Sequence, residues 1–223
     1  MRDTKSVATD YLVQGIAHEI RNPVTAIGGF ARRIKKRLNG EPEIGRYVDI
    51  IIQESKRLEQ LVSRVNELSN ILSAKLILDD VSGVLRQIIE RFAHRIKKQG
   101  VILETDITER LPLAEIDSSQ LVTALSNVIE NSLDAMSDGG CIMIKARPDG
   151  DYIVISIADT GRGISQRYAD SVCDPFVTSK THGSGLGLTM VRQVAENHNA
   201  KILIESEEKR GSLVALCLPI KQQ

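Results

Sequence analysis

The chain has 223 residues, and its 29 lysine and arginine residues balance 29 aspartate and glutamate residues. This balance offers no basic stripe for nucleic acid, and the longest apolar runs are only as long as a strand, so we expect no membrane segment. The three cysteines lack metal-ligand spacing and fit a reducing compartment. We therefore expect a cytoplasmic protein, or the cytosolic part of a larger or membrane-associated one.

The first third of the chain predicts two packed helices. Apolar residues recur in alternating steps of three and four from Val13 to Leu38 and from Ile44 to Leu72, and the helix-breaking stretch 39–42 separates the two runs. This spacing is typical of the narrow seam along which helices pack into bundles. We expect an antiparallel two-helix hairpin. Because one hairpin is a poor core for two such seams, two copies of the chain should pair into a four-helix bundle.

His18 is predicted to lie beside this seam and not within it. It follows the seam residue Ala17 by one position, which corresponds to roughly 100° around a helix. Its imidazole should therefore lie on the flank of the bundle, where a second domain could reach it. Glu19 is its neighbour, and Asn22 lies one turn later on the same face. A histidine and glutamate pair on a helix is usually a plain surface pair, so its meaning depends on the rest of the chain.

The remainder of the chain is predicted to form an α/β unit. The helical spacing is lost within residues 73–78, so we place a helical domain at residues 1–74 and a second domain at residues 75–223. In the second domain, capping residues and glycines predict helices that end near residues 98, 136 and 197. Alternating patterns predict strands at 101–106, 141–147, 152–158, 201–206 and 213–219. The expected fold class is α+β, with the hairpin followed by a two-layer sandwich of a largely antiparallel sheet and helices on one face.

Three stretches of the second domain carry groups that suit a nucleotide. Asn127 and Asn131 share one helix face, so their amide oxygens can point at one Mg²⁺ ion, although asparagines at this spacing are more often caps or solvent-facing residues. Asp159 ends a strand and could accept a hydrogen bond from an adenine amine, unless it belongs to an ordinary Asp-Gly turn. Residues 183–188 open a helix, where backbone N–H groups suit a triphosphate. This last stretch matches neither a Rossmann fingerprint nor a P-loop.

The order and spacing of these stretches resemble the two-component sensor histidine kinases. Five segments are similar to the family's histidine, asparagine, first glycine, phenylalanine and second glycine boxes, namely residues 18–23, 127–131, 159–163, 174–180 and 183–188. The resemblance covers nearly the whole chain. It implies a dimerisation and phosphoacceptor domain followed by a Bergerat-type ATP-binding domain.

The resemblance also implies a role for each matching residue. His18 would be the phosphoacceptor, Glu19 would orient or deprotonate it, and Asn22 would place a water that dephosphorylates a response regulator. ATP and Mg²⁺ would be the cofactors, with Asn131, helped by Asn127, as the metal ligand. The residues around ATP would be Asp159 at the adenine amine, Gly161 and Gly163 beside the base, Ser212 as an adenine-side hydroxyl, Lys180 at the terminal phosphate, and Gly183, Gly185, Leu186 and Gly187 along the phosphates.

Two features depart from the family pattern. Ser132 follows Asn131 where the family usually has alanine, and we expect this change between small residues to be tolerated. The chain also starts at the hairpin, without a preceding sensor segment. The signal would then come from an upstream sensor domain or from another protein.

The sequence therefore predicts autophosphorylation on His18 and transfer of the phosphoryl group to an aspartate of a separate response regulator, by a homodimer that is also expected to dephosphorylate that regulator. Two alternatives remain. An ATPase or serine kinase of the same superfamily would share Asn131, Asp159 and the glycines without needing His18, but its water-activating glutamate would stand where this chain has Asn127. A degenerate kinase could instead act as a dimeric scaffold or phosphatase, although all five boxes look intact.

Overall fold

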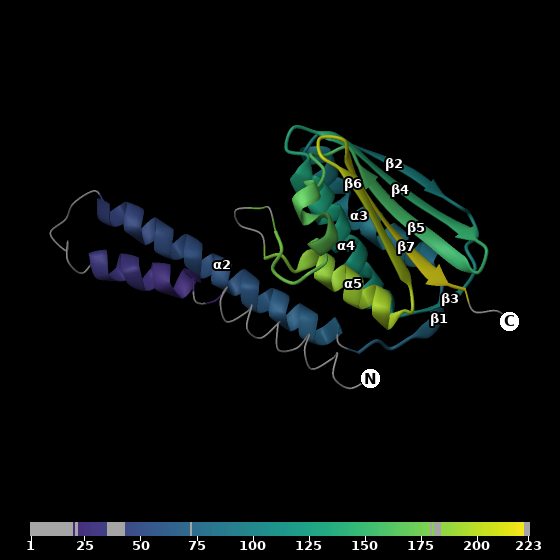
Figure 1. The fold of residues 1–223 in the computed structure, drawn as a ribbon, viewed down its shortest axis with the longest axis horizontal. Coiled ribbons are helices and arrows are strands. Elements are labelled where there is room, and N and C mark those ends of the chain that lie inside the picture. Colours follow the sequence, from purple (N-terminus) through teal and green to yellow (C-terminus); the bar gives the residue numbers. More distant parts are fainter. Residues whose placement is uncertain are drawn as a thin grey trace. The chain divides into compact units, whose positions relative to one another are not determined.

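The computed structural model describes residues 20, 22–34, 43–71, 73–178, 180 and 184–220 (Figure 1). The chain divides into two compact units. The helical unit consists of Met1–Asn70 with Thr178–Gly185, and the sandwich unit consists of Ile71–Val177 with Leu186–Gln223. The domain boundary between residues 74 and 75 stays a prediction.

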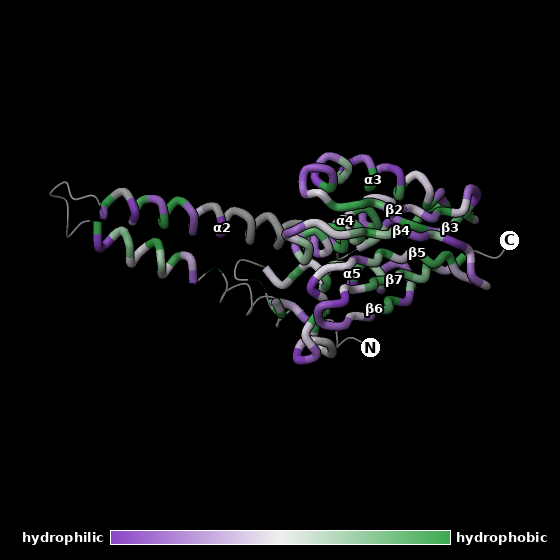
Figure 2. The backbone as a smooth tube through the Cα atoms, turned by 90° about the horizontal axis from the view of Figure 1, so that it is seen from above, coloured by the Kyte–Doolittle hydropathy of each residue, from purple (hydrophilic) through white to green (hydrophobic). Residues whose placement is uncertain are grey.

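The described part of the helical unit has the two helices that the apolar spacing predicts. Residues 22–34 are helical, and α2 spans Glu43–Ile71, within one residue of the predicted run at both ends. An aromatic contact joins the two helices: the rings of Phe30 and Tyr47 stack with their centroids 5.8 Å apart. Figure 2 shows hydrophobic and hydrophilic residues alternating along the coloured parts of both helices, as expected for helices with one packing face.

The sandwich unit contains a mixed five-stranded sheet in the order β2-β4-β5-β7-β6. Its strands are β2 (Val101–Ile107), β4 (Gly140–Asp149), β5 (Tyr152–Asp159), β6 (Lys201–Glu207) and β7 (Gly211–Pro219). Only β2 and β4 pair in parallel within this sheet, and a parallel pair needs a long crossover connection. That crossover contains α4, so the helix with the two asparagines is held against the middle of the sheet.

Three helices cover one face of the sheet (Figure 1). They are α3 (Val81–Lys98), α4 (Ser118–Ala135) and α5 (Gly187–Asn197). The core forms where alternate residues of β4 and β5 meet apolar residues of α4, and the members of this core exposed by 2% or less include Ile142, Ile144, Ile153, Ile155, Ile157, Leu121, Leu125, Ile129 and Leu133. The predicted two-layer sandwich is confirmed.

Short elements and one turn differ from the prediction. A separate two-stranded sheet joins β1 (Ile77–Asp79) to β3 (Ala114–Ile116), and a 3₁₀ helix, η1, spans Gln166–Ser171. The turn between β4 and β5 was expected at residues 148–150, but β4 continues through Pro148 to Asp149. Pro148 is tolerated there because the β2 partner strand ends opposite Ala146, so the missing N–H has no ladder bond to make on that side.

The N-terminus of α4 is fixed by Asp117. One oxygen of its carboxylate accepts hydrogen bonds from the N–H groups of Ser119 and Gln120, both at 3.1 Å, as a helix N-cap does. The other oxygen accepts the N–H of Lys75 at 3.0 Å. The N–H of Asp117 itself donates to Nε2 of His198 at 2.9 Å. Asp117 therefore connects the start of α4 both to the segment after α2 and to the end of α5.

A second set of hydrogen bonds ties down the end of α2. Ile71 is 3% exposed, and its carbonyl accepts a hydrogen bond from the side-chain amide of Asn197. The same amide nitrogen lies 2.9 Å from Oε1 of Gln120, and the side-chain amide of Gln120 donates to the carbonyl of Ser73 at 2.8 Å. The last residue of α2 and the segment after it are thus bonded to α4 and α5.

The difference in stability between the unaltered chain and a variant of Asp117 should depend on pH in a defined way. Burial alone would raise the pKa of Asp117, but the hydrogen bonds from Lys75, Ser119 and Gln120 outweigh it and hold the pKa below its usual value. The stabilisation is therefore complete above the ordinary aspartate pKa of about 3.9 and is lost as the pH falls through the lowered value. In urea unfolding at pH 7, the free energy of unfolding of Asp117→Asn should be lower than that of the unaltered chain. This difference should narrow below about pH 4.

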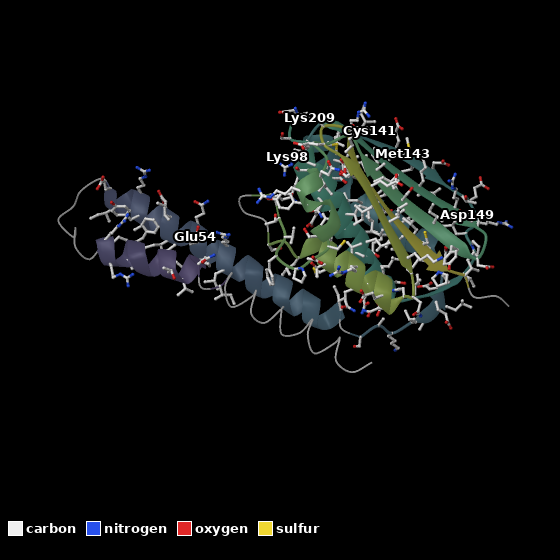
Figure 3. The ribbon with its side chains drawn as sticks, in the orientation of Figure 1. Glu54, Lys98, Cys141, Met143, Asp149 and Lys209 are labelled. Carbon is white, nitrogen blue, oxygen red and sulfur yellow. The ribbon has the colours of Figure 1, made fainter. Side chains whose placement is uncertain are left out.

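Two further variants complete this test. Asp117→Ala removes the cap altogether and should lower the free energy of unfolding by about 1–2 kcal/mol at pH 7. Asp149→Asn removes an exposed carboxylate at the far end of β4 (Figure 3) and should have little effect at either pH. A deficit of Asp117→Asn that is the same at pH 7 and pH 3 would contradict the assigned direction of the pKa shift.

Candidate functional site

The two asparagines of α4 meet the first residue of α5. Asn127 is 5% exposed, and its amide nitrogen donates to the carbonyl of Thr123 at 2.9 Å and lies 3.9 Å from the sulfur of Met190. A Cβ atom added to Gly187 would lie 3.2 Å from Oδ1 of Asn127 and 3.4 Å from Nδ2 of Asn131. The absence of a side chain at Gly187 therefore lets the N-terminus of α5 approach both amides closely. Three of the predicted site residues come together here.

This cluster has the chemistry for a hard cation bound to phosphates. Amide oxygens are ligands that Mg²⁺ accepts, and Mg²⁺ usually keeps several waters and takes few ligands from the protein. Because the nitrogen of Asn127 is held by the Thr123 carbonyl, its oxygen is the atom turned towards Gly187. The N-terminus of α5 adds the partial positive charge that favours an anion. Asn127 and Asn131 fit the predicted metal ligands.

Asp159 ends β5 with both carboxylate oxygens bound. Oδ1 accepts the N–H of Gly161 at 2.9 Å, and Oδ2 accepts the hydroxyl of Ser132 on α4, also at 2.9 Å. The carboxylate is half-buried, whereas Ser132 is 3% exposed. An ionised carboxylate has about four lone-pair positions, so these two bonds leave it able to accept from a ligand.

The loop after Asp159 passes between two other backbone segments. The N–H of Arg162 donates to the carbonyl of Ala135 at 3.1 Å, and the carbonyl of Arg162 accepts the N–H of Lys209 at 2.7 Å. Gly163 has a φ of +67°, and a Cβ atom at this position would overlap the carbonyl oxygen of Glu207. The loop is therefore fixed between the end of α4 and the turn that connects β6 to β7, and Gly163 is required by backbone packing in addition to any ligand.

Ser212 lies next to Asp159 on the neighbouring strand. The two residues are register partners in the β5–β7 pair, and Oγ of Ser212 lies 2.9 Å from Oγ of Ser206. The hydroxyl of Ser206 also accepts the N–H of Ile164 at 2.8 Å and donates to the carbonyl of Gly211 at 2.9 Å. Figure 3 shows Lys209, in the turn between Ser206 and Ser212, at the same end of the sheet as Cys141 at the start of β4.

The segment between β5 and α5 contains a salt bridge and one strained residue. Arg192 of α5 pairs with Asp174 at 3.2 Å. Phe176 has a φ of +67°, which is rare for a bulky residue and strains the backbone. Burial raises the pKa of the Cys173 thiol, and the charge of Asp174 raises it further, whereas Arg192 lowers it by less. This cysteine therefore does not have the lowered pKa of a reactive thiolate.

The structure describes some of the remaining predicted residues but not others. Leu186 is fully buried just before α5, and Asn22 is an exposed residue of the first helix. Lys180 and Gly185 belong to the helical unit, where the N–H of Lys180 donates to Oγ1 of Thr178 at 3.1 Å. His18, Glu19 and Gly183 lie outside the described residues.

Sequence reasoning missed two hydroxyl residues that organise the site. Ser132 was expected only to be a tolerated change, and its hydrogen bond to the Asp159 carboxylate was not foreseen. Helical spacing could have found it, because residues 128, 132 and 135 form one stripe of α4 and Ala135 faces the loop after Asp159. Ser206 gave no signal, since its bonds to Ile164 and Ser212 depend on strand register and not on a motif.

Comparison with known families matches both parts of the chain. The phospho-acceptor domain described as His Kinase A matches residues 8–74. The domain described as a histidine kinase-, DNA gyrase B- and HSP90-like ATPase matches residues 116–222. Together the two matches cover well over half of the chain.

Curated relatives and solved structures are similar over nearly the full length of the chain. Sporulation kinase E of Bacillus subtilis is 31% identical over 95% of this chain, and the sensor histidine kinase ZraS of Escherichia coli is 30% identical over 98%. The chain spans only 28% and 47% of these two proteins. The crystal structure of histidine kinase ThkA in complex with the response regulator protein TrrA matches with a TM-score of 0.74 and 26% identity, over 99% of this chain and 64% of that one. The histidine kinase AdeS of Acinetobacter baumannii shares the fold, with a TM-score of 0.70 and 21% identity over 92% of this chain and 98% of that one.

Proposed function

We propose that this chain, which belongs to the two-component sensor histidine kinases, transfers the γ-phosphoryl group of ATP to His18 and then to an aspartate of a response regulator. The observation that carries the proposal is the pairing of two sites in one chain. His18 lies within the matched phospho-acceptor domain, and the matched ATPase domain contains the cluster of Asn127, Asn131 and Gly187 beside the bound carboxylate of Asp159.

In the proposed reaction, the sandwich unit binds and orients ATP. Asp159 accepts a hydrogen bond from the adenine amine, and Ser212 lies beside it in register. Asn131 and Asn127 hold Mg²⁺, which when bound neutralises charge on the phosphates. The glycine-rich stretch of Gly183, Gly185, Leu186 and Gly187 lines the phosphates, and Lys180 meets the terminal one. Phosphoryl transfer needs little covalent help from a protein, so positioning and charge neutralisation account for catalysis.

The histidine supplies the nucleophilic nitrogen. It must attack as the neutral imidazole, which is the main form of an ordinary histidine at pH 7. Glu19 fixes the tautomer and accepts the released proton. Asn22, an exposed residue one turn later, positions a water that removes phosphate from the phosphorylated regulator.

The structure weighs against the alternative of an efficient ATP hydrolase. Hydrolases of this superfamily need a carboxylate that activates water at the position of Asn127. Here Asn127 is buried, and its amide is bound to the Thr123 carbonyl, so it has neither the charge nor the freedom of a general base. A nucleotide held at this site is therefore better suited to donate its phosphoryl group to another residue than to water.

The proposed assembly is a homodimer that receives a signal and acts on a response regulator. In a single chain, Val24, Val48 and Ile52 are 51%, 40% and 48% exposed, and Val24 and Val48 belong to the predicted packing seams. A second copy would cover them.

ThkA was solved with a response regulator, and the same class of partner fits this chain. The proposed source of the signal is a sensor domain or another protein. No helix among the described residues is long and apolar enough to cross a membrane.

Replacement of His18 tests the phosphoacceptor. His18→Ala should abolish incorporation of label from γ-labelled ATP while ATP binding stays nearly unchanged, because the acceptor and the nucleotide lie in different matched domains. In the unaltered chain the label should be acid-labile and stable in alkali. His94→Ala, which removes an exposed histidine of α3, is the matched control and should label normally. Label that persists in His18→Ala would refute the assignment.

Replacement of Asp159 tests recognition of adenine. A hydrogen bond to a charged group contributes about 1.5–3 kcal/mol, which corresponds to roughly tenfold to more than a hundredfold in affinity. Asp159→Asn should therefore weaken ATP strongly in calorimetry, whereas inorganic triphosphate should bind as before. Equal losses for the two ligands would show that Asp159 does not recognise the base.

Two neighbouring substitutions separate kinase from phosphatase activity. Glu19→Ala should slow autophosphorylation by roughly 10²- to 10⁴-fold, the range typical of a lost general base. Asn22→Ala should leave labelling of His18 and transfer to the regulator largely intact but slow the removal of phosphate from the regulator. If Asn22→Ala stopped autophosphorylation as completely as Glu19→Ala at unchanged helix content, Asn22 would belong to the transfer step.

A further inference from the structure

The hydroxyl of Ser132 is the second donor to the carboxylate of Asp159. This hydroxyl donates a hydrogen bond to Oδ2 at 2.9 Å, and the N–H of Gly161 donates one to Oδ1 at the same distance. The two donors come from different elements, since Ser132 lies on α4 and Gly161 lies in the loop after β5. Ser132 is 3% exposed, so water does not compete freely for its hydroxyl.

We infer that Ser132 is a positioning residue that holds the Asp159 carboxylate in the orientation in which it accepts a hydrogen bond from the 6-amino group of adenine. This inference rests on the proposed function, in which Asp159 binds the base. It assigns to Ser132 a contribution to base selectivity, although Ser132 itself need not touch the nucleotide.

The physical reason lies in the rotation of the carboxylate. The terminal torsion of an aspartate has a broad, two-fold preference, so a single donor leaves the plane of the group poorly fixed. Donors at both oxygens fix that plane before the ligand arrives, which reduces the ordering cost of binding. An ionised carboxylate can only accept, and the Ser132 hydroxyl must therefore point its hydrogen at Oδ2. The remaining lone pairs then face a ligand in a fixed direction and suit an amine at position 6 of the purine.

Alanine at position 132 is expected to preserve the fold while removing this second donor. The substitution deletes one small buried polar atom and leaves the helix and the loop bonds of Ala135 and Gly161 in place. The consequence should therefore appear in ligand selectivity and not in overall stability. This adds a role to a position at which the sequence predicted only that serine is tolerated.

Calorimetry on the full chain with three ligands tests the inference. The ligands are ATP, the ATP analogue whose purine carries hydrogen in place of the 6-amino group, and inorganic triphosphate. Ser132→Ala should weaken ATP by roughly threefold to thirtyfold, the range of one hydrogen bond, and should change the other two by less than about twofold. Ser132→Cys keeps the size of the side chain but has only a weak donor, so its affinities should follow those of Ser132→Ala.

Ser126 provides a matched control on the same helix. It is 5% exposed, and its hydroxyl has no hydrogen-bond partner among the residues that the structure describes. Ser126→Ala therefore removes a buried serine hydroxyl from α4 without touching Asp159, and all three affinities should stay unchanged. If Ser126→Ala lowered the affinity for ATP, relative to the other two ligands, as much as Ser132→Ala does, the inference would be overturned.

The other outcomes distinguish the inference from the proposed function. If Asp159→Asn weakens ATP selectively while Ser132→Ala does not, Ser132 has no positioning role, and the proposed function stands. If Ser132→Ala weakens all three ligands equally, it loosens the site as a whole, and the assigned role is wrong. If Asp159→Asn itself fails to discriminate between ATP and triphosphate, the assignment of Asp159 to adenine fails, and the role of Ser132 fails with it.

Discussion

The helical repeat of α4 is the constraint on which the site depends. One stripe of this helix packs on the sheet through Leu125 and Ile129 and, one turn further on, brings Ser132 to Asp159, whereas the opposite side presents Asn127 and Asn131 to the start of α5. The directions of these stripes cannot be changed independently, because they are set by 3.6 residues per turn. Burial of the apolar stripe therefore also orients the polar ones, and the cap at Asp117 fixes where the helix starts.

Close backbone packing provides the second constraint. Gly163 and Gly211 have positive φ values, and a Cβ atom at either would overlap a carbonyl oxygen, of Glu207 and Asp159 respectively. The loop after Asp159 thus touches the turn between β6 and β7 without intervening side chains. The Ser206 hydroxyl strengthens the same contact, because it accepts the N–H of Ile164 in this loop and donates to the carbonyl of Gly211. The carboxylate at the end of β5 is therefore followed by a loop whose backbone is packed and hydrogen-bonded, and not by a free loop.

Local signals were enough to predict most of the sandwich unit. Capping residues and glycines located α3, α4 and α5 to within about a residue, because the same groups satisfy the helix ends in the structure. The strands β1 and β3 were missed, since three residues are too short to show an alternation. The parallel pairing of β2 with β4 and the bond from Ser132 to Asp159 join residues far apart in sequence, and no local pattern encodes them. The asparagines and the glycines of residues 183–188 were singled out by spacing and chemistry, their specific roles came from the resemblance to a family, and those roles stay predictions.

Helix α5 is in close contact with other elements at both of its ends. Its first residue, Gly187, lies against the amides of Asn127 and Asn131, and its last residue, Asn197, is bonded to the carbonyl of Ile71, where α2 ends. An α-helix of this length measures about 16 Å and behaves as a stiff rod. The place where phosphates are proposed to bind and the bond that holds the carbonyl of Ile71 therefore lie at opposite ends of the same short helix.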